Sequence, residues 1–80
     1  MTRSERTMLA AATLNDPRWD MIRTRDPLAD GRFYYSVRTS GVFCRPVCKA
    51  RLARPENVAF HADRTGALAA GFRPCKRCKP

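Results

Sequence analysis

The four cysteines of this chain constrain its fold more than any other feature. They form two close pairs, Cys44-x3-Cys48 and Cys75-x2-Cys78, separated by 26 residues. Each pair can place two sulfurs on one ion, and the segment between the pairs is long enough to fold back and bring them together. Four thiolates in two such pairs are typical of a tetrahedral zinc site. The spacing therefore predicts one Zn²⁺ bound by all four cysteines.

Two other uses of the cysteines are open. Two disulfides would suit a small secreted domain. The apolar stretch near the N-terminus, Met8 to Thr13, is too short and too polar for a signal peptide or a membrane span. A redox-active dithiol would have the spacing of Cys75-Lys-Arg-Cys78, but such a motif normally opens a helix, and only two residues follow it here. Zinc is favoured over both alternatives.

The length of the chain also favours a metal. Eighty residues make at most one domain, and a domain of this size buries only a thin core. A bound metal commonly supplies the stability that such a core lacks. Zinc binding is therefore expected to contribute to the free energy of folding.

The charge of the chain points to a polyanionic partner. Sixteen Lys and Arg residues against seven Asp and Glu give a formal net charge of +9. Residues 44–80 carry nine basic and two acidic residues, so the positive charge gathers around the cysteines. Nucleic acid is the first expectation. A membrane surface is not favoured, because no basic amphipathic helix with a large apolar face is visible.

The first half of the chain predicts one helix and one strand. Residues 1–15 mix charges with an Ala-rich patch, and we expect a helical turn or a disordered lead-in to a domain spanning 16–80. Asp16 as N-cap and Pro17 at the first helical position predict a helix ending near Thr24. Within it, Trp19 is expected to pack in the core.

Residues 32–38 alternate as a half-buried strand does. Phe33, Tyr35 and Val37 would face the core, while the other face would be open. Exposure is accordingly expected for the remaining side chains, among them Tyr34, Ser36 and Arg38.

The second half predicts a strand at Val42-Phe43 that leads directly into Cys44, and a loop over 44–48 because Pro46 blocks regular structure. Val58 to Phe60 is a short strand candidate, and a helix over 63–70 would begin at Asp63 and stop at Gly71. Phe72 would pack back on the core. His61 is not needed as a metal ligand beside four cysteines, so we expect it to be a surface or packing residue. The fold class is α+β: a small zinc-bound domain with a short antiparallel sheet, one helix before it and one after.

Several segments together resemble a known family. They are Asp16-Pro-Arg-Trp19, Arg25-Asp-Pro-Leu-Ala-Asp-Gly31, Tyr35-Ser-Val-Arg-Thr-Ser-Gly-Val-Phe-Cys-Arg-Pro-Val-Cys48, Pro55-Glu-Asn-Val58 and Ala67-Leu-Ala-Ala-Gly-Phe-Arg-Pro-Cys-Lys-Arg-Cys78. In order and spacing they are similar to the N-terminal zinc domain of the bacterial adaptive-response protein Ada, a methyl phosphotriester repair domain. The resemblance covers about residues 16 to 80.

The resemblance implies direct repair of DNA methyl phosphotriesters in the bacterial cytoplasm. Cys44 would take the methyl group irreversibly, so that the domain acts once, and Cys48, Cys75 and Cys78 would complete the zinc shell. Relatives of this kind often carry a helix-turn-helix activator, so further domains or a partner chain are expected partners alongside double-stranded DNA. The family's DNA contacts map onto Ser40, Lys49, Arg51 and Arg73.

Two of those contacts depart from the family pattern. Ser40 stands where Thr is usual and keeps the hydroxyl. Lys49 stands where Arg is usual, so it keeps the charge but loses bidentate recognition of phosphate. Lys76, Arg77 and Lys79 have no mapped role and are equally well explained as phosphate contacts or as solvated surface.

The implied chemistry agrees with the residues. A free thiol has a pKa of about 8.5, but zinc holds sulfur as thiolate at neutral pH. Four thiolates on Zn²⁺ carry a formal charge of −2, which methylation of Cys44 would change to −1. One unit charge about 4 to 6 Å from a phosphate is worth on the order of 1 kcal/mol in water. We therefore hypothesise that methylation tightens DNA binding without a change of fold.

Two other functions are compatible with the same cysteines. Four-cysteine zinc sites are usually structural, so the domain would then be a zinc module that binds nucleic acid without chemistry. A redox-sensing zinc thiolate switch is the third reading. The motifs that flank the cysteines favour a reactive Cys44 over both.

Overall fold

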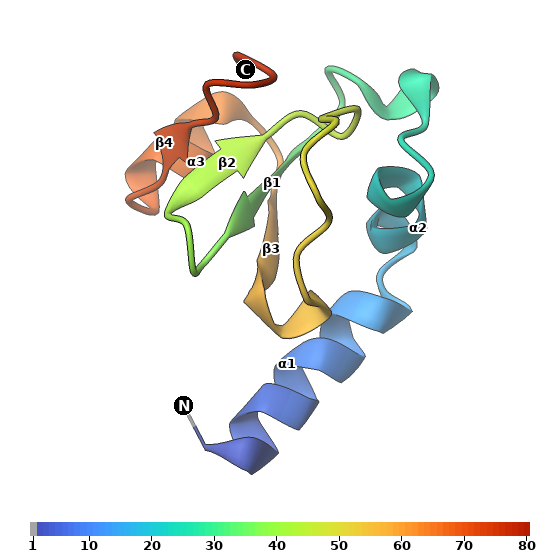
Figure 1. Ribbon diagram of the computed structural model, residues 1–80, viewed down its shortest axis with the longest axis vertical. Helices are drawn as coiled ribbons and strands as arrows, with labels where there is room; N and C mark the ends of the chain where they lie inside the picture. Colours follow the sequence, from blue (N-terminus) through green and yellow to red (C-terminus); the bar gives the residue numbers. More distant parts are fainter. Residues whose placement is uncertain (1) are drawn as a thin grey trace.

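A computed structural model describes residues 2–80 as three α-helices and a four-stranded sheet (Figure 1). The helices are α1 (Arg3–Asn15), α2 (Pro17–Arg23) and α3 (Arg64–Ala69). The strands are β1 (Tyr34–Val37), β2 (Val42–Cys44), β3 (Val58–His61) and β4 (Arg73–Pro74), and two short 3-10 turns lie at η1 (Pro27–Ala29) and η2 (Pro55–Asn57). Within residues 2–80 no helix combines the length and apolar character that a bilayer span requires.

The sheet has the order β3-β1-β2-β4. β1 pairs antiparallel with β2 and with β3, as the sequence predicted, while β4 pairs parallel with β2. The parallel pair is held by the Arg73 N–H, which donates to the Gly41 carbonyl, and by the Cys75 N–H, which donates to the Phe43 carbonyl, each at 3.0 Å. The α+β class is confirmed, and the sheet is mixed rather than wholly antiparallel because of this two-residue edge strand.

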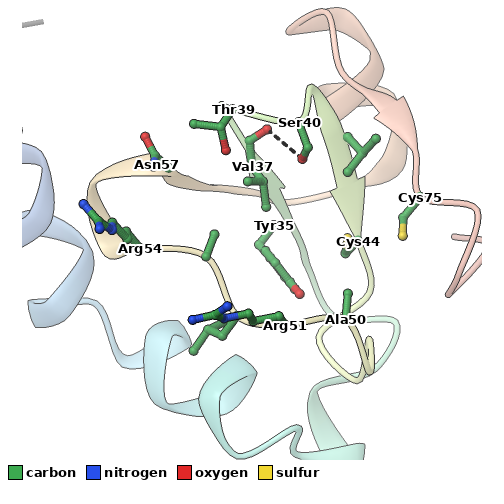
Figure 2. Close-up of a pocket in the computed structure, with 13 residues that line it drawn as sticks. Tyr35, Val37, Thr39, Ser40, Cys44, Ala50, Arg51, Arg54, Asn57 and Cys75 are labelled. Carbon is green, nitrogen blue, oxygen red and sulfur yellow. Dashed lines mark hydrogen bonds between the residues drawn. The ribbon is translucent and has the colours of Figure 1, made fainter.

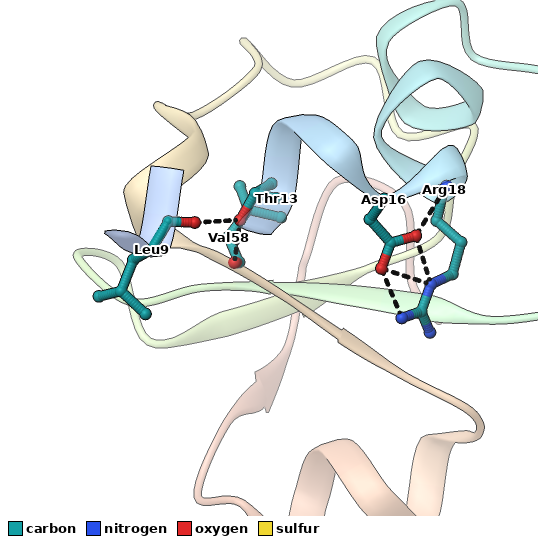
Figure 3. A network of polar contacts seen from close by, with 5 residues as sticks. All are labelled: Leu9, Thr13, Asp16, Arg18 and Val58. Atoms are coloured by element: carbon teal, nitrogen blue, oxygen red, sulfur yellow. Dashed lines mark hydrogen bonds and ion pairs between the residues drawn. The ribbon is translucent and has the colours of Figure 1, made fainter. Parts of the chain in front are cut away.

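The segment expected as a helical turn or a disordered lead-in forms the complete helix α1. The Thr2 hydroxyl accepts from the Glu5 N–H, and the Thr2 N–H donates to the Glu5 carboxylate, which makes a capping box. At the other end the buried Thr13 hydroxyl donates to the Leu9 carbonyl at 3.0 Å and to the Val58 carbonyl at 3.4 Å (Figure 3). The disordered alternative is therefore wrong, and a domain boundary at residue 16 stays a prediction.

Helix α2 begins and ends as predicted. The Asp16 carboxylate accepts from the Arg18 N–H at 2.9 Å, and Pro17 occupies the first turn. Arg18 also forms an ion pair with Asp16 at 2.7 Å, and its hydrogen bonds lower the pKa of that carboxyl (Figure 3). Ile22 is buried and Trp19 packs against the same core, so the predicted packing role of Trp19 is confirmed.

The two faces of the sheet are both covered. On one face Phe33, Tyr35, Cys44 and Val58 are buried together with Ile22. On the other face, expected to be open, Ser36 and Phe43 are completely buried beneath α3, whose Ala67 is also fully buried. The expected exposure of Ser36 is therefore wrong, because a helix from later in the chain packs over it.

On this face Tyr34 is less exposed than expected, whereas the exposure of Arg38 is as expected. The Tyr34 ring is half-buried and meets the Phe43 ring edge-on, with centroids 5.8 Å apart. Arg38 is exposed.

Helix α3 follows its sequence signals. The Asp63 carboxylate accepts from the Gly66 N–H at 2.7 Å, and Gly71 ends the helix with φ 94. Beyond it, the Phe72 ring packs 5.7 Å from the His61 ring, whose Nε2 lies 2.9 Å from the Ser36 hydroxyl. His61 is thus a packing residue, and burial, followed by the charge of Arg18, lowers its pKa.

Candidate metal centre

The structure brings the four cysteine sulfurs together. All four ligand atoms of Cys44, Cys48, Cys75 and Cys78 lie within 4.8 Å of one another. A tetrahedral zinc with Zn–S bonds of about 2.3 Å places its sulfurs about 3.8 Å apart, so the cluster fits such an ion with small adjustments. All four are free thiols, which argues against the disulfide alternative.

Two parallel strands bring the cysteine pairs to the same end of the sheet. Cys44 is the last residue of β2, and Cys75 directly follows β4. Each strand then runs into a tight turn, closed by the Cys48 N–H donating to the Arg45 carbonyl and by the Lys79 N–H donating to the Cys75 carbonyl, both at 3.0 Å. Because β2 and β4 are parallel, both turns lie at one end of the sheet, and all four sulfurs meet there.

Two arginines hold the ligand turns. Arg25 Nε donates to the Cys48 carbonyl at 3.1 Å, and Arg45 Nη1 donates to the Cys78 carbonyl at 3.4 Å. The backbone N–H of Arg45 also donates to Cys78 Sγ at 3.3 Å. Arg45 is anchored by Asp30, with Nε 2.9 Å from Oδ1, and these hydrogen bonds lower the pKa of Asp30. Sequence reasoning assigned no role to either arginine, since their partners are 15 or more residues away.

Three of the thiols, those of Cys44, Cys75 and Cys78, differ in pKa when no metal holds them. Burial, and then the charge of Cys48, raises the pKa of Cys44 well above its ordinary range, and burial raises that of Cys78 to about 11. Burial acts in the same direction on Cys75, but backbone hydrogen bonds from Cys78 and Arg77 outweigh it and bring its pKa to about 7. Metal binding must therefore displace protons, which makes the affinity pH-dependent.

A cavity of about 570 Å³ opens beside two of the sulfurs, and we call it the reactive cavity. Cys44 and Cys75 line it, together with Tyr35, Ser40 and Arg51 (Figure 2). Tyr35 is the cross-strand partner of Cys44 and is only 3% exposed. Burial, followed by the charge of Cys44, raises the pKa of its phenol above the ordinary value. The reactive cavity thus brings two sulfurs together with hydroxyl groups and a guanidinium. The sequence had predicted only core packing for Tyr35, not a place in this cavity.

The four predicted DNA contacts lie around the cysteine cluster. Ser40 and Arg51 are exposed residues that line the reactive cavity. Lys49 is exposed beside Cys48 and Cys78, and Arg73 is exposed on β4 beside Cys75. Their contact with DNA stays a prediction.

The reactive cavity also contains polar residues that sequence reasoning missed. They are Thr39, Arg54 and Asn57. In the sequence Arg54 is one more basic residue in a basic run, and no spacing signal ties it to Cys44. The fold alone places it there.

Comparison with known proteins gives the same picture for most of the chain. Residues 17–80 match the family described as the metal binding domain of Ada. The chain is 58% identical over 71 residues to the bifunctional transcriptional activator/DNA repair enzyme Ada of Escherichia coli K12, covering 89% of this chain and 20% of that protein. It is 43% identical over 70 residues to AdaA of Bacillus subtilis 168, covering 88% of this chain and 33% of that one. The chain thus spans about a fifth to a third of the length of these relatives.

Solved structures agree with the fold. A crystal structure of the methylated N-ADA/DNA complex matches with a TM-score of 0.80 and 61% identity over 82% of this chain and 50% of that chain. The refined structure of the DNA methyl phosphotriester repair domain of E. coli Ada matches with a TM-score of 0.72 and 62% identity, over 79% of this chain and 68% of that chain.

Proposed function

The chain belongs to the family of the Ada metal binding domain, and on that premise we propose that it repairs DNA by direct removal of methyl groups from methyl phosphotriesters. Zn²⁺ bound by four cysteines is its cofactor. One observation carries the proposal: Cys44, a member of a four-sulfur cluster, lines a cavity rimmed by a hydroxyl and a guanidinium. The relatives named as a DNA repair enzyme and as a methyl phosphotriester repair domain support it.

The proposed reaction is a single methyl transfer to Cys44. The Cys44 sulfur attacks the methyl carbon, the carbon–oxygen bond breaks, and its electron pair leaves with the phosphate oxygen. The products are a thioether at Cys44 and an ordinary phosphodiester anion, and no proton has to move. When bound, zinc would keep the sulfur as thiolate at neutral pH, which the buried thiol by itself resists. Nothing regenerates the cysteine, so the domain acts once.

The residues around the reactive cavity would position the phosphate. Arg51 can pair with the two non-bridging oxygens of a neighbouring phosphate, and the Ser40 hydroxyl can donate to one oxygen. Lys49 and Arg73 would extend the same contacts on either side of the cluster. Contacts of this kind position the duplex and carry no sequence information by themselves.

The choice of Cys44 over Cys75 is the part of the proposal that needs a direct test. Cys44 is only 3% exposed, whereas Cys75 is half-buried and lines the same cavity. The family motif favours Cys44, while exposure favours Cys75. A methyl group entering the cavity could therefore reach either sulfur, and only mapping of the product distinguishes them.

The test is intact mass and peptide mapping after the zinc-loaded protein meets DNA with a methyl phosphotriester. We expect the gain of one methyl group at Cys44, and no gain in Cys44→Ser whose zinc content is shown to be unchanged. Methylation of Cys75 would reassign the nucleophile. Zinc-loaded protein that binds this DNA and gains no methyl group would favour the structural zinc module.

The relatives' second named activity, transcriptional activation, is proposed to follow from the transfer. Methylation changes the formal charge of the cluster from −2 to −1 and so weakens its repulsion of DNA. The signal would reach the transcription machinery through a further domain or a partner chain with a helix-turn-helix. Equal affinity of methylated and unmethylated protein at matched salt would contradict this switch. We place the activity in the bacterial cytoplasm, where thiols stay reduced.

A further inference from the structure

The reactive cavity is the middle of a longer groove. At one end it shares Val42 and Cys75 with a hollow lined by Arg73, Lys76 and Arg77. At the other end it shares residues with a hollow that reaches α1. The shared residues are Thr39, Arg54 and Asn57, and the hollow adds Arg6 and Glu56. We call the three connected hollows the basic groove; it runs from β4 past Cys44 to helix α1.

The charges in the basic groove are almost all positive and unpaired. Within residues 2–80 the ion pairs join Arg18 to Asp16, Arg23 to Asp20 and Arg45 to Asp30, and none of them lies in the groove. Of the remaining acidic residues, three are occupied at the N-termini of helices; these are Glu5, Asp26 and Asp63. Glu56 is the one acidic residue that lines the groove in the described part of the chain.

The α1 end of the groove is well positioned by the fold. Arg54 precedes η2, is exposed, and belongs to none of the ion pairs within residues 2–80, so its guanidinium is available to a ligand. Figure 2 shows Arg54 and Asn57 on the side of the reactive cavity away from Cys75. Arg6 stands on α1, which packs on η2 and is tied to β3 by the hydrogen bond of Thr13. Both arginines are therefore presented by ordered secondary structure.

We propose that the DNA backbone continues from the phosphate at Cys44 into the α1 end of the basic groove, where Arg54 and Arg6 contact neighbouring phosphates. Guanidinium groups suit this role because they bind two phosphate oxygens at once. Thr39 and Asn57 line the same hollow as the two arginines and add neutral donors. The inference rests on the proposed function and enlarges its DNA-binding surface. It makes α1 part of that surface, whereas the sequence suggested only a lead-in.

The test compares Arg6→Gln, Arg54→Gln and the double variant with a matched control. The control is Arg64→Gln, which removes the same charge from α3 on the opposite face of the sheet. Arg64 lines none of the hollows that make up the groove. Each zinc-loaded protein is titrated by fluorescence anisotropy with a duplex that carries one methyl phosphotriester, over a series of salt concentrations. We expect each groove variant to lower the slope of log affinity against log salt by about one, and to lose roughly three- to tenfold in affinity at low salt. The control should bind as the wild type does.

Glu56→Gln supplies the converse variant, because removing the one carboxylate from the groove should strengthen binding. Three results would decide the matter. The expected slopes support the groove. Groove variants that bind like Arg64→Gln, while Arg51→Gln loses affinity, would overturn the α1 contacts and leave the proposed function standing. A wild-type protein that does not bind this duplex would overturn both.

Discussion

The two faces of the sheet achieve burial in different ways. On the α3 face, Phe43, Ser36 and Ala67 are completely buried, and the aromatic rings of Tyr34 and Phe72 complete the packing. On the cysteine face, four polar sulfurs and the reactive cavity replace part of the apolar contact. The first face is held by packing alone, whereas the second combines a buried apolar cluster with four sulfurs that can hold an ion. Because a chain of 80 residues buries only a thin core, we expect a metal held by the four cysteines to stabilise the face that contains the cavity.

Removal of the metal should have the largest effect, because it releases four side chains of the cysteine face at once. Structural zinc commonly contributes about 10–16 kcal/mol of apparent binding free energy. We expect a strong chelator to unfold both faces, since β2 belongs to both. Circular dichroism and the fluorescence of Trp19, which packs on the cysteine face, would report the loss. Unchanged spectra in protein shown to be metal-free would contradict this view.

Truncation of Phe43 tests the α3 face on its own. The side chain is completely buried, so Phe43→Ala should lower the free energy of unfolding of the zinc-loaded protein by about 3–5 kcal/mol. Leu68→Ala on the same helix layer is the control, because Leu68 is 44% exposed and its loss should cost less than about 0.5 kcal/mol. Chemical denaturation measures both. Similar losses would mean that the α3 face adds little to stability.

The hydrogen bond beneath α3 should have a smaller effect. Ser36→Ala removes the hydroxyl 2.9 Å from His61 Nε2 and leaves a partly buried ring nitrogen without that partner, which costs about 0.5–1.5 kcal/mol. The double variant Ser36→Ala with His61→Phe should recover most of the loss, since both polar partners are then gone. Denaturation of the two variants makes the comparison. No recovery in the double variant would show that the ring packs by shape alone.

The protonation of His61 should have the smallest effect. Burial, then the charge of Arg18, lowers its pKa in the fold, so folding favours the neutral ring. The resulting stability is complete above the unfolded pKa of about 6.5 and is lost as the pH falls through the folded pKa. His61 is the lone histidine, so its NMR titration is unambiguous. A measured pKa at or above 6.5 would show that this face is more open than its packing indicates.

The predictions that were confirmed rest on signals within a few residues of each other. Asp16-Pro17 at the start of α2, and Asp63 and Gly71 at the ends of α3, act through local hydrogen bonds and backbone conformation. Helix α1 has a local signal of the same kind, since Thr2-x-x-Glu5 follows the capping-box pattern. The expectation of a lead-in overlooked it. The spacing of the cysteines belongs to this local class as well.

The features that were missed depend on residues far apart in the chain. β4 is two residues long and contains Pro74, so it has no strand pattern of its own and exists only through its pairing with β2. The alternation of the strand predicts that Ser36 is exposed. It is buried because α3, nearly thirty residues later in the chain, packs over it. Arg45 acquires its role from Asp30 and Cys78, which its neighbours in sequence do not reveal.

The sequence by itself determined the ligand set, the helix caps, the concentration of positive charge and the resemblance to the Ada zinc domain, because these depend on residue identity and short spacing. Only the tertiary structure decided that β2 and β4 run parallel, so that both cysteine turns meet at one end of the sheet, and that Arg54 and Arg6 lie along the groove that contains Cys44. The reason is physical. Pairing and covering are set by free energies summed over contacts distant in the chain, against the entropy of closing the loops between them, and no local window contains that sum.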